Sequence, residues 1–212
     1  MPGGAIIDDG VAVKRPNLAV AAIMGASARL LRVERVLIVG LMSLLTALIL
    51  LNVTTRYLGV PIYWIDESAV YSVVWLTFIG ASAMTRLRLD FVVAMLTERL
   101  PKRGVFVCKI ASTCGVVFFG LALIWMCWLW MDPVGFAQSG FDAKEFGAQT
   151  FNFLYTERTQ TLNWPTWVLY LTIPIFGVTM TIHGLANVLE DLGVVAKTKH
   201  TGFVLSDVDG VN

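Results

Sequence analysis

Four uncharged apolar runs constrain this chain more than any other feature. Val36–Leu51, Ala69–Thr85 and Ile110–Met131 contain no charged residue, and Thr166–Leu189 contains only the titratable His183. A helix needs roughly 20 apolar residues to cross a bilayer core of about 30 Å, so each run with a few flanking residues is long enough. We therefore expect an all-α integral membrane protein with four transmembrane helices.

The composition agrees with this class of protein. Hydrophobic residues make up 57% of the 212-residue chain and charged residues only 15%, whereas a soluble domain carries about a quarter charged residues. A large soluble helical core is the alternative, but soluble helices keep a polar stripe that these runs lack. The net charge is only +1, so we expect no nucleic-acid partner.

The runs and their flanks set the expected boundaries. The four spans cover residues 36–58, 68–86, 105–131 and 166–190. The chain then has three parts: a cytoplasmic N-terminal segment (1–35), a four-span membrane domain with an outer loop (36–190, loop 132–165) and a cytoplasmic tail (191–212).

Lysine and arginine counts predict the orientation. In chain order, the five segments outside the apolar runs hold 5, 1, 6, 2 and 2 of these residues. The six in the middle connection include Arg86 and Arg88. Because basic residues concentrate on the cytoplasmic side of a membrane, we expect both termini and the middle connection to be cytoplasmic.

Two segments outside the spans are amphipathic. Asn17–Glu34 mixes apolar residues with Ala, Ser and Arg. This pattern favours a helix on the cytoplasmic membrane surface, with its arginines among lipid headgroups. Alternatively, the segment extends the first span. Residues 91–100 place apolar side chains at helical spacing before Pro101, which predicts a second short surface helix.

His183 is the one Asp, Glu, Lys, Arg or His residue within the four apolar runs. Such residues are costly in a membrane and often functional. We favour an interhelical hydrogen bond for His183 over a role in a proton relay. Haem b between spans requires paired histidines, and His200 lies outside the runs, so we expect no cofactor. The cysteines form no Cys-x-x-Cys motif and are interpreted as packing residues; they are Cys108, Cys114 and Cys127.

Motifs for catalysis or coupled transport are missing from the sequence. There is no Walker loop, no Ser/His/Asp set and no metal-ligand spacing. The matched broken helices of an inverted-repeat transporter are also not evident. We therefore expect a non-enzymatic, auxiliary membrane subunit. A membrane anchor of a respiratory or redox enzyme and a stand-alone small-molecule carrier are the alternatives.

The short connection after the first run concentrates charge and aromatic residues. Asn52 and Arg56 are spaced i, i+4 and share a helix face. Asp66 and Glu67 begin the second span, where a helix N-terminus favours carboxylates. Arg56 could bridge to these carboxylates; alternatively, it reaches the interface alone while they cap the helix. We expect three further residues to lie in the aromatic belt at the membrane interface, namely Tyr57, Tyr63 and Trp64.

A patch of small residues follows Phe78 in the second span and comprises Gly80, Ala81, Ser82 and Ala83. Small side chains let helices approach closely. The patch therefore predicts a helix contact, either within the chain or with a partner.

Taken in order, these motifs resemble the small permease subunit of tripartite ATP-independent periplasmic (TRAP) transporters, the DctQ family, from about Val36 to Leu189. The resemblance rests on Asn52-Val53-x-x-Arg56-Tyr57, Trp64-x-Asp66-Glu67, Phe78-x-Gly80-Ala81, Leu96, Leu100-Pro101, Trp164-Pro165-x-Trp167 and Pro174. Two positions depart from the family pattern. Asp90 stands where a histidine is frequent, and Ala94 stands where an acidic residue is frequent.

The resemblance implies a function. In this family a large permease subunit (DctM-type) carries the sodium and substrate sites, and a periplasmic binding protein (DctP-type) delivers an organic acid. The small subunit supports the scaffold in the bacterial inner membrane, in contact with membrane lipids. The candidate partner or scaffold residues are Asn52, Arg56, Tyr57, Trp64, Asp66, Glu67, Phe78, Gly80, Ala81, Arg86, Arg88 and Trp167.

Overall fold

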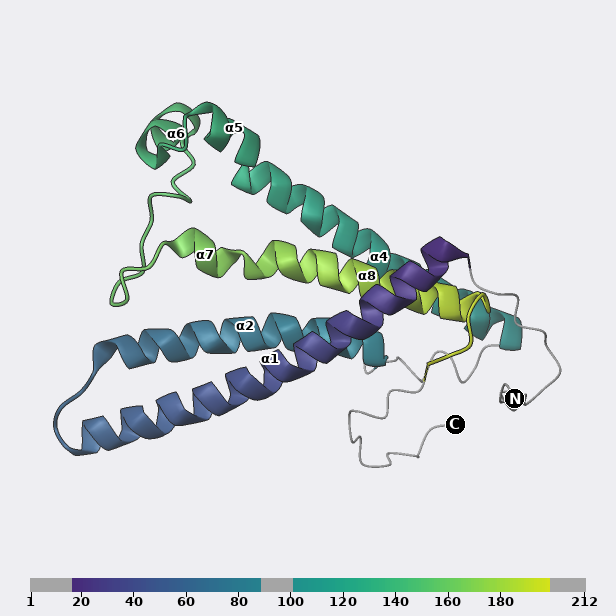
Figure 1. Ribbon diagram of the computed structural model, residues 1–212, viewed down its shortest axis with the longest axis horizontal. Helices are drawn as coiled ribbons and strands as arrows, with labels where there is room; N and C mark the ends of the chain where they lie inside the picture. Colours follow the sequence, from purple (N-terminus) through teal and green to yellow (C-terminus); the bar gives the residue numbers. More distant parts are fainter. Residues whose placement is uncertain (1–16, 89–100, 199–212) are drawn as a thin grey trace, which may run out of the picture.

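The computed structural model describes residues 17–88 and 101–198, and these residues are mainly helical. Four helical segments are long and apolar enough to cross a membrane, as the sequence predicted. The helices are α1 (Leu18–Tyr57), α2 (Tyr63–Leu87), α4 (Lys102–Met131), α5 (Pro133–Gln138), α6 (Ala143–Thr150), α7 (Thr166–Tyr170) and α8 (Thr172–Asp191) (Figure 1).

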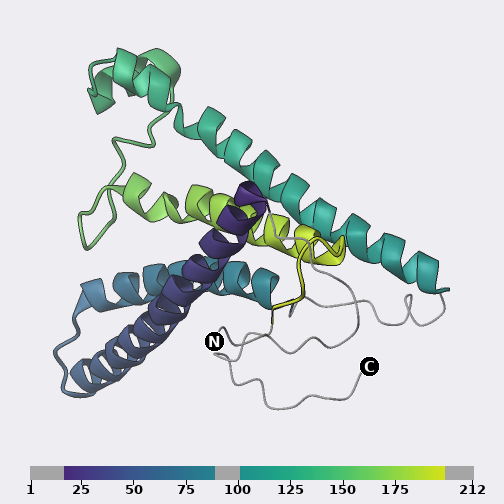
Figure 2. The same cartoon turned by 45° about the vertical axis from the view of Figure 1, so that its right-hand side comes forward.

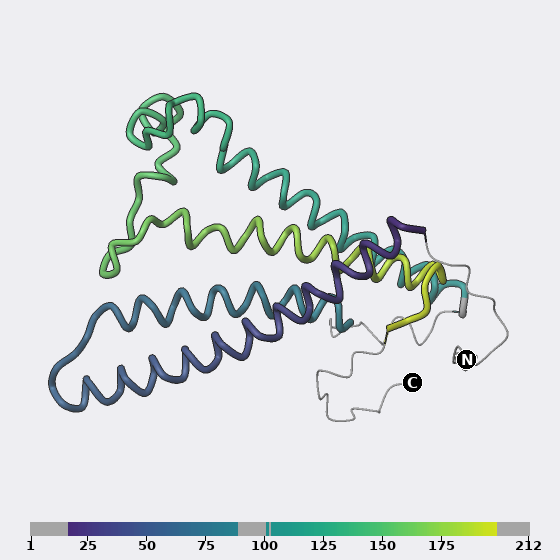
Figure 3. The backbone as a smooth tube through the Cα atoms, viewed as in Figure 1, coloured from purple at the N-terminus to yellow at the C-terminus, as the bar shows by residue number. Residues whose placement is uncertain are grey.

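The spans form an open array in which α8 is central. It contacts α4 on one side and α2 on the other, while α1 pairs with α2 and also contacts α8. We call the end with Arg88 and Asp191 the inner end, and the end with loop 132–165 the outer end, after the predicted orientation. Helices α4 and α8 are close at the inner end and diverge toward the outer end (Figures 1 and 3).

The first span begins earlier than the sequence suggested. Helix α1 runs without interruption from Leu18 to Tyr57, so Asn17–Glu34 is an extension of the span and not a separate surface helix. No proline lies between Asn17 and Tyr57 to end the helix. The extension crosses α8 (Figure 2). The second expected surface helix, residues 91–100, lies outside the described residues.

The fourth span is broken near its outer end. Helix α7 ends at Tyr170, and α8 begins at Thr172. Pro174 explains this break, because a proline ring clashes with the carbonyl group four residues earlier, here that of Tyr170. A proline inside a membrane span is expected to kink the helix in this way.

Glycines allow close packing of α4 against α8. A Cβ atom at Gly120 would overlap the Thr181 hydroxyl group, and one at Gly184 would lie 2.9 Å from a methyl group of Val117. A Cβ atom at Gly177 would similarly lie 3.0 Å from the Ile124 side chain. Small residues at these points let the two backbones approach, which is the usual way helices associate in a membrane.

Candidate functional site

A charge cluster joins the outer ends of α1 and α2. Arg56 Nη2 lies 2.5 Å from Asp66 Oδ2. Arg56 Nε donates to Asn52 Oδ1 at 2.9 Å, and Asn52 Nδ2 donates to Asp66 Oδ1 at 2.5 Å. The three side chains therefore close a ring of bonds across the short loop between the helices. The Arg56 and Asp66 side chains remain 57% and 45% exposed, so the ring lies at the surface.

Glu67 is not part of this ring. Its carboxylate accepts hydrogen bonds from the backbone N–H groups of Gln160, Thr161 and Leu162 at 2.8–2.9 Å, and from the Thr161 hydroxyl group. Glu67 thus holds the end of the outer loop against the start of α2. From the sequence, both Asp66 and Glu67 were possible partners of Arg56. In the structure Arg56 pairs with Asp66 and not with Glu67.

The outer loop has a small aromatic core of its own. The rings of Phe136 and Tyr155 stack at 3.9 Å, and Phe146 packs edge-on against both. The Tyr155 hydroxyl group donates to the Met131 carbonyl at 2.7 Å. Burial raises the pKa of the Tyr155 phenol, with a smaller contribution from Asp132, which keeps it a neutral donor. This core ties helices α5 and α6 to the end of α4.

Several predicted interfacial aromatic residues lie at the outer end. Tyr57, Tyr63 and Trp64 are exposed, whereas Trp167 is half-buried beside Tyr155, with ring centroids 6.3 Å apart. Exposed Tyr and Trp side chains at the end of a span match the aromatic belt of membrane proteins.

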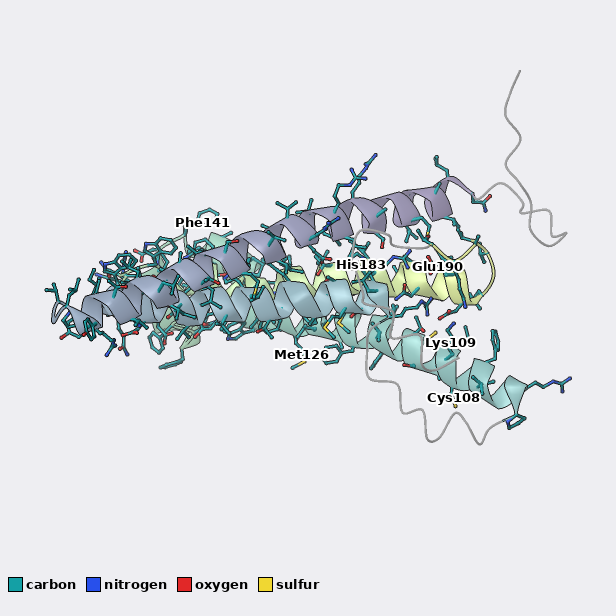
Figure 4. All side chains as sticks on the ribbon, turned by 90° about the horizontal axis from the view of Figure 1, so that it is seen from below. Cys108, Lys109, Met126, Phe141, His183 and Glu190 are labelled. Carbon is teal, nitrogen blue, oxygen red and sulfur yellow. The ribbon has the colours of Figure 1, made fainter. Side chains whose placement is uncertain are left out.

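A buried polar core joins α1, α2 and α8 toward the inner end. His183 Nε2 lies 3.0 Å from Glu34 Oε2, and His183 Nδ1 lies 2.8 Å from Ser27 Oγ. The Ser82 hydroxyl group donates to Glu34 Oε1 at 2.6 Å. His183, Ser27 and Ser82 are fully buried and Glu34 is 3% exposed (Figure 4 labels His183). These bonds confirm the interhelical hydrogen bonding that we favoured for His183.

This core has the residue types of a hydrolase triad but not its accessibility. Ser27 has no exposed surface, so its hydroxyl group cannot meet a substrate in this structure. An attacking serine must reach a scissile carbonyl group. Among the described residues there is also no group of three or more His, Cys, Asp or Glu side chains that could hold a metal ion.

An ion-pair network lies next to this core at the inner end. Arg86 binds Glu190 and Asn187, each at 2.6 Å. Asp191 lies 2.9 Å from Arg88 and 2.8 Å from Lys109, which brings in α4 (Figure 4 labels Lys109 and Glu190). The network therefore connects α2, α4 and α8. The Arg86 and Glu190 side chains are each only 3% exposed.

Some of the candidate partner residues of α2 contact other helices of the same chain, and others do not. Arg86 is buried, so its guanidinium group is not free for a partner. Phe78 packs on Phe176, with ring centroids 5.3 Å apart. In the small-residue patch Ala81 is partly exposed, whereas a Cβ atom at Gly80 would meet no atom within 4 Å. Gly80 therefore faces away from the other spans.

Sequence reasoning missed the polar face of α8. Thr179, His183, Asn187 and Glu190 follow one another at intervals of four, four and three residues, which places them on one side of a helix. This spacing was the available signal. The signal is weak because Asn187 lies at the end of the apolar run and Glu190 just beyond it, where polar residues are typical of a solvated flank. The partner residues Ser27 and Glu34 gave no sign of burial in the sequence.

The fold and these sites define a four-span membrane subunit whose buried charged side chains at the inner end are paired with one another. A comparison with protein families agrees: residues 45–193 match the family described as tripartite ATP-independent periplasmic transporters, DctQ component. The chain belongs to this family and is a small permease subunit of a TRAP transporter. Together with the four apolar helices, this membership indicates a multi-pass protein of the bacterial inner membrane. No curated protein matches the chain.

Proposed function

We propose that this subunit is the non-catalytic scaffold partner of a large, sodium-coupled DctM-type permease. In this proposal a periplasmic DctP-type protein delivers an organic acid to the assembled transporter, and the small subunit itself binds neither sodium nor substrate. The supporting observation is the pairing of the buried charged side chains with one another inside the helix array, combined with membership of the family.

The pairing argues for a rigid element. A transport site must release its ligands, whereas Glu34, His183, Arg86 and Glu190 are all at least nine-tenths buried and bonded to groups of the same chain. Removing one partner from a buried ion pair costs about 3–5 kcal/mol. Such groups hold helices at fixed positions and are poorly suited to exchange partners during a transport cycle.

A helix face of α2 is the surface that we assign to the large permease. It comprises Val70, Val73, Thr77, Gly80 and Met84, which recur at intervals of three or four residues. The four residues other than Gly80 are exposed, and space is open beside Gly80. A glycine in the middle of an exposed apolar face permits close approach of a partner helix. The same face is opposite to the side of α2 that contacts α8.

The experiment compares two glycine variants in the assembled transporter. Gly80→Leu should reduce co-purification of the large permease at least several-fold, because the added side chain keeps a partner helix away. Gly40→Leu is the matched control, since Gly40 also lies in a span with no atom within 4 Å of an added Cβ. Equal loss of the permease in both variants, or none in either, would argue against this surface.

Reconstitution tests the proposed division of labour. Proteoliposomes with this subunit alone should take up no organic acid in a sodium gradient, whereas the three-component system should be active. Sodium-driven uptake by the small subunit alone would overturn the scaffold proposal.

A further inference from the structure

Two cavities lie one after the other along α1, and we call the pair the trough. The outer cavity has a volume of about 390 Å³ and the inner cavity about 230 Å³, and both are lined by Trp75. The outer cavity also reaches Trp64 and Trp164 at the outer end. The inner cavity is lined by Glu34 and extends to Leu30. The trough therefore follows α1 over much of the membrane-spanning length.

One face of α1 makes a wall of the trough. Its leucines recur at intervals of seven, four, three and four residues, as expected for a single helix face. They are Leu30, Leu37, Leu41, Leu44 and Leu48. Helices α2 and α8 form the other walls, through residues such as Phe78 and Ile175.

The trough lies at the depth of lipid hydrocarbon. Asp66 and Arg86 mark the two polar ends of α2 and are 20 positions apart, which corresponds to a helical rise of about 30 Å. This length equals the thickness of a bilayer core. Trp75 lies near the middle of that interval, so the trough opens into the acyl-chain region and not into water.

Hydroxyl groups in the wall of the outer cavity are already used as donors. Ser68 donates to the Trp64 carbonyl and Ser72 to the Ser68 carbonyl, both at 2.8 Å. The Tyr71 hydroxyl group donates to Glu67 at 3.3 Å. A polar solute would lose its hydration in this cavity without gaining these donors, whereas a hydrocarbon chain loses nothing.

A cation, Arg56, lies beyond the outer end of the trough and outside the lining of both cavities, where it pairs with Asp66. The leucine face of α1 continues one turn beyond Leu48 with Asn52, which binds Arg56 Nε. Among the described contacts Arg56 uses Nε and Nη2, and its side chain is 57% exposed. The Nη1 group is therefore available at headgroup depth, and guanidinium groups favour phosphate. Trp64 and Trp164 lie at the same end, where indole rings favour the membrane interface.

We propose that this trough binds one phospholipid of the outer leaflet, with an acyl chain beside the α1 leucines and the phosphate group at Arg56. The inference concerns the subunit itself and does not rest on its proposed partner or substrate. The alternative occupant, a transmembrane helix of the large permease, becomes an outcome of the test.

The first test measures lipid retained by the purified full-length chain. The protein is washed in a mild detergent, and bound phosphatidylethanolamine and phosphatidylglycerol are counted by native mass spectrometry. Leu44→Trp should fill the outer cavity and lower retained phospholipid at least fivefold. Val39→Trp is the matched control, because Val39 is exposed on the opposite face of α1 and should retain lipid like the parent. Arg56→Gln should also lower retention. Equal retention by Leu44→Trp and the parent would overturn the site.

A second test uses the parent chain and needs no substitution. A phosphatidylethanolamine with a photoreactive diazirine in its acyl chain is equilibrated with the protein, and cross-linked peptides are mapped. Labels should concentrate between Leu41 and Leu48 and between Ser68 and Trp75. Uniform labelling of all lipid-facing helix surfaces would overturn the proposal. A separate Leu44→Cys variant tests the alternative occupant: a disulfide with a cysteine in the large permease would also overturn the proposal, because a helix would then occupy the trough.

Discussion

Asp66 and Glu67 are neighbours in the chain but stabilise different parts of the molecule. Asp66 pairs with Arg56 across the first hairpin, whereas Glu67 binds the backbone of residues 160–162. In a helix, consecutive side chains point in directions about 100° apart, so two adjacent carboxylates can reach different neighbours. Their substitutions should therefore have different consequences.

The first prediction separates these two roles. Glu67→Ala should speed trypsin cleavage after the exposed Arg158, because the loop that follows loses its anchor. Arg56→Ala and Asp66→Ala should leave the cleavage rate unchanged. Each should lower the free energy of unfolding by only about 0–1 kcal/mol, the usual range for an exposed ion pair.

Double variants give the control for this prediction. Arg56→Ala with Asp66→Ala should be less than additive, because the two side chains share a bond. Arg56→Ala with Glu67→Ala should be additive. Strong coupling between Arg56 and Glu67 would contradict the assignment of separate roles.

The second prediction concerns the buried pair of Glu34 and His183. His183→Leu leaves the Glu34 carboxylate buried with Ser82 alone, and should destabilise the protein by about 3–5 kcal/mol. Combining Glu34→Leu with His183→Leu should cost less than the sum of the single changes. Denaturant unfolding of the purified protein in detergent micelles provides the measurement. Arg32→Leu, which changes an exposed residue of the same helix, is the control. If it lowered the free energy of unfolding as much as His183→Leu, the loss could not be assigned to the buried pair.

At the scale of elements, α8 organises the array through two opposite faces. The polar face with Thr179, His183, Asn187 and Glu190 meets α1 and α2. The opposite face contains Gly177, Thr181 and Gly184 and packs on α4. Polar bonds link α8 to α1 and α2, whereas close van der Waals contact and the ion pair between Asp191 and Lys109 link it to α4. Helix α8 can therefore hold three spans without a closed bundle.

The third prediction tests the glycine face. Gly120→Val should destabilise the protein by about 1–3 kcal/mol through overpacking, because an added side chain would overlap Thr181. Gly115→Val is the matched control in the same helix, since a Cβ atom there meets nothing within 4 Å. Both changes alter helix propensity equally, so the difference between their unfolding free energies reports the packing. No difference would show that α4 and α8 tolerate separation at this point.

At the scale of the whole molecule, the exposed surface of the spans is largely apolar. Phe118, Trp125 and Met126, for example, each expose more than half of their surface (Figure 4 labels Met126). A water-soluble protein does not leave such large apolar surfaces uncovered. This surface fits contact with lipid and with another membrane subunit.

The fourth prediction is the topology. In a variant whose three native cysteines are replaced by serine, Ala148→Cys should react with a membrane-impermeant maleimide from the periplasmic side. Ala196→Cys should react only after the membrane is opened. Both residues are exposed, so burial cannot explain a missing label. Labelling of both positions from the periplasmic side would contradict cytoplasmic termini, which we expect from the distribution of basic residues.

The sequence by itself determined the number of spans, the all-α class and the family. Hydrophobicity summed over about 20 residues decides whether a segment crosses a membrane, and this sum depends only on neighbouring positions. The bridge between Arg56 and Asp66 was also foreseeable, because ten residues and one tight turn separate the two. The break near Pro174 follows equally from local geometry.

Only the tertiary structure decided which polar groups are buried together. Glu34 and His183 are 149 residues apart, and Glu67 and Thr161 are 94 residues apart. Whether such side chains meet depends on which helices become neighbours and on how each helix is rotated. The same dependence explains why Arg86, which looks like a surface charge in the sequence, is buried in an ion pair. Hydropathy specifies that a segment enters the membrane, but packing between segments specifies which of its faces are hidden.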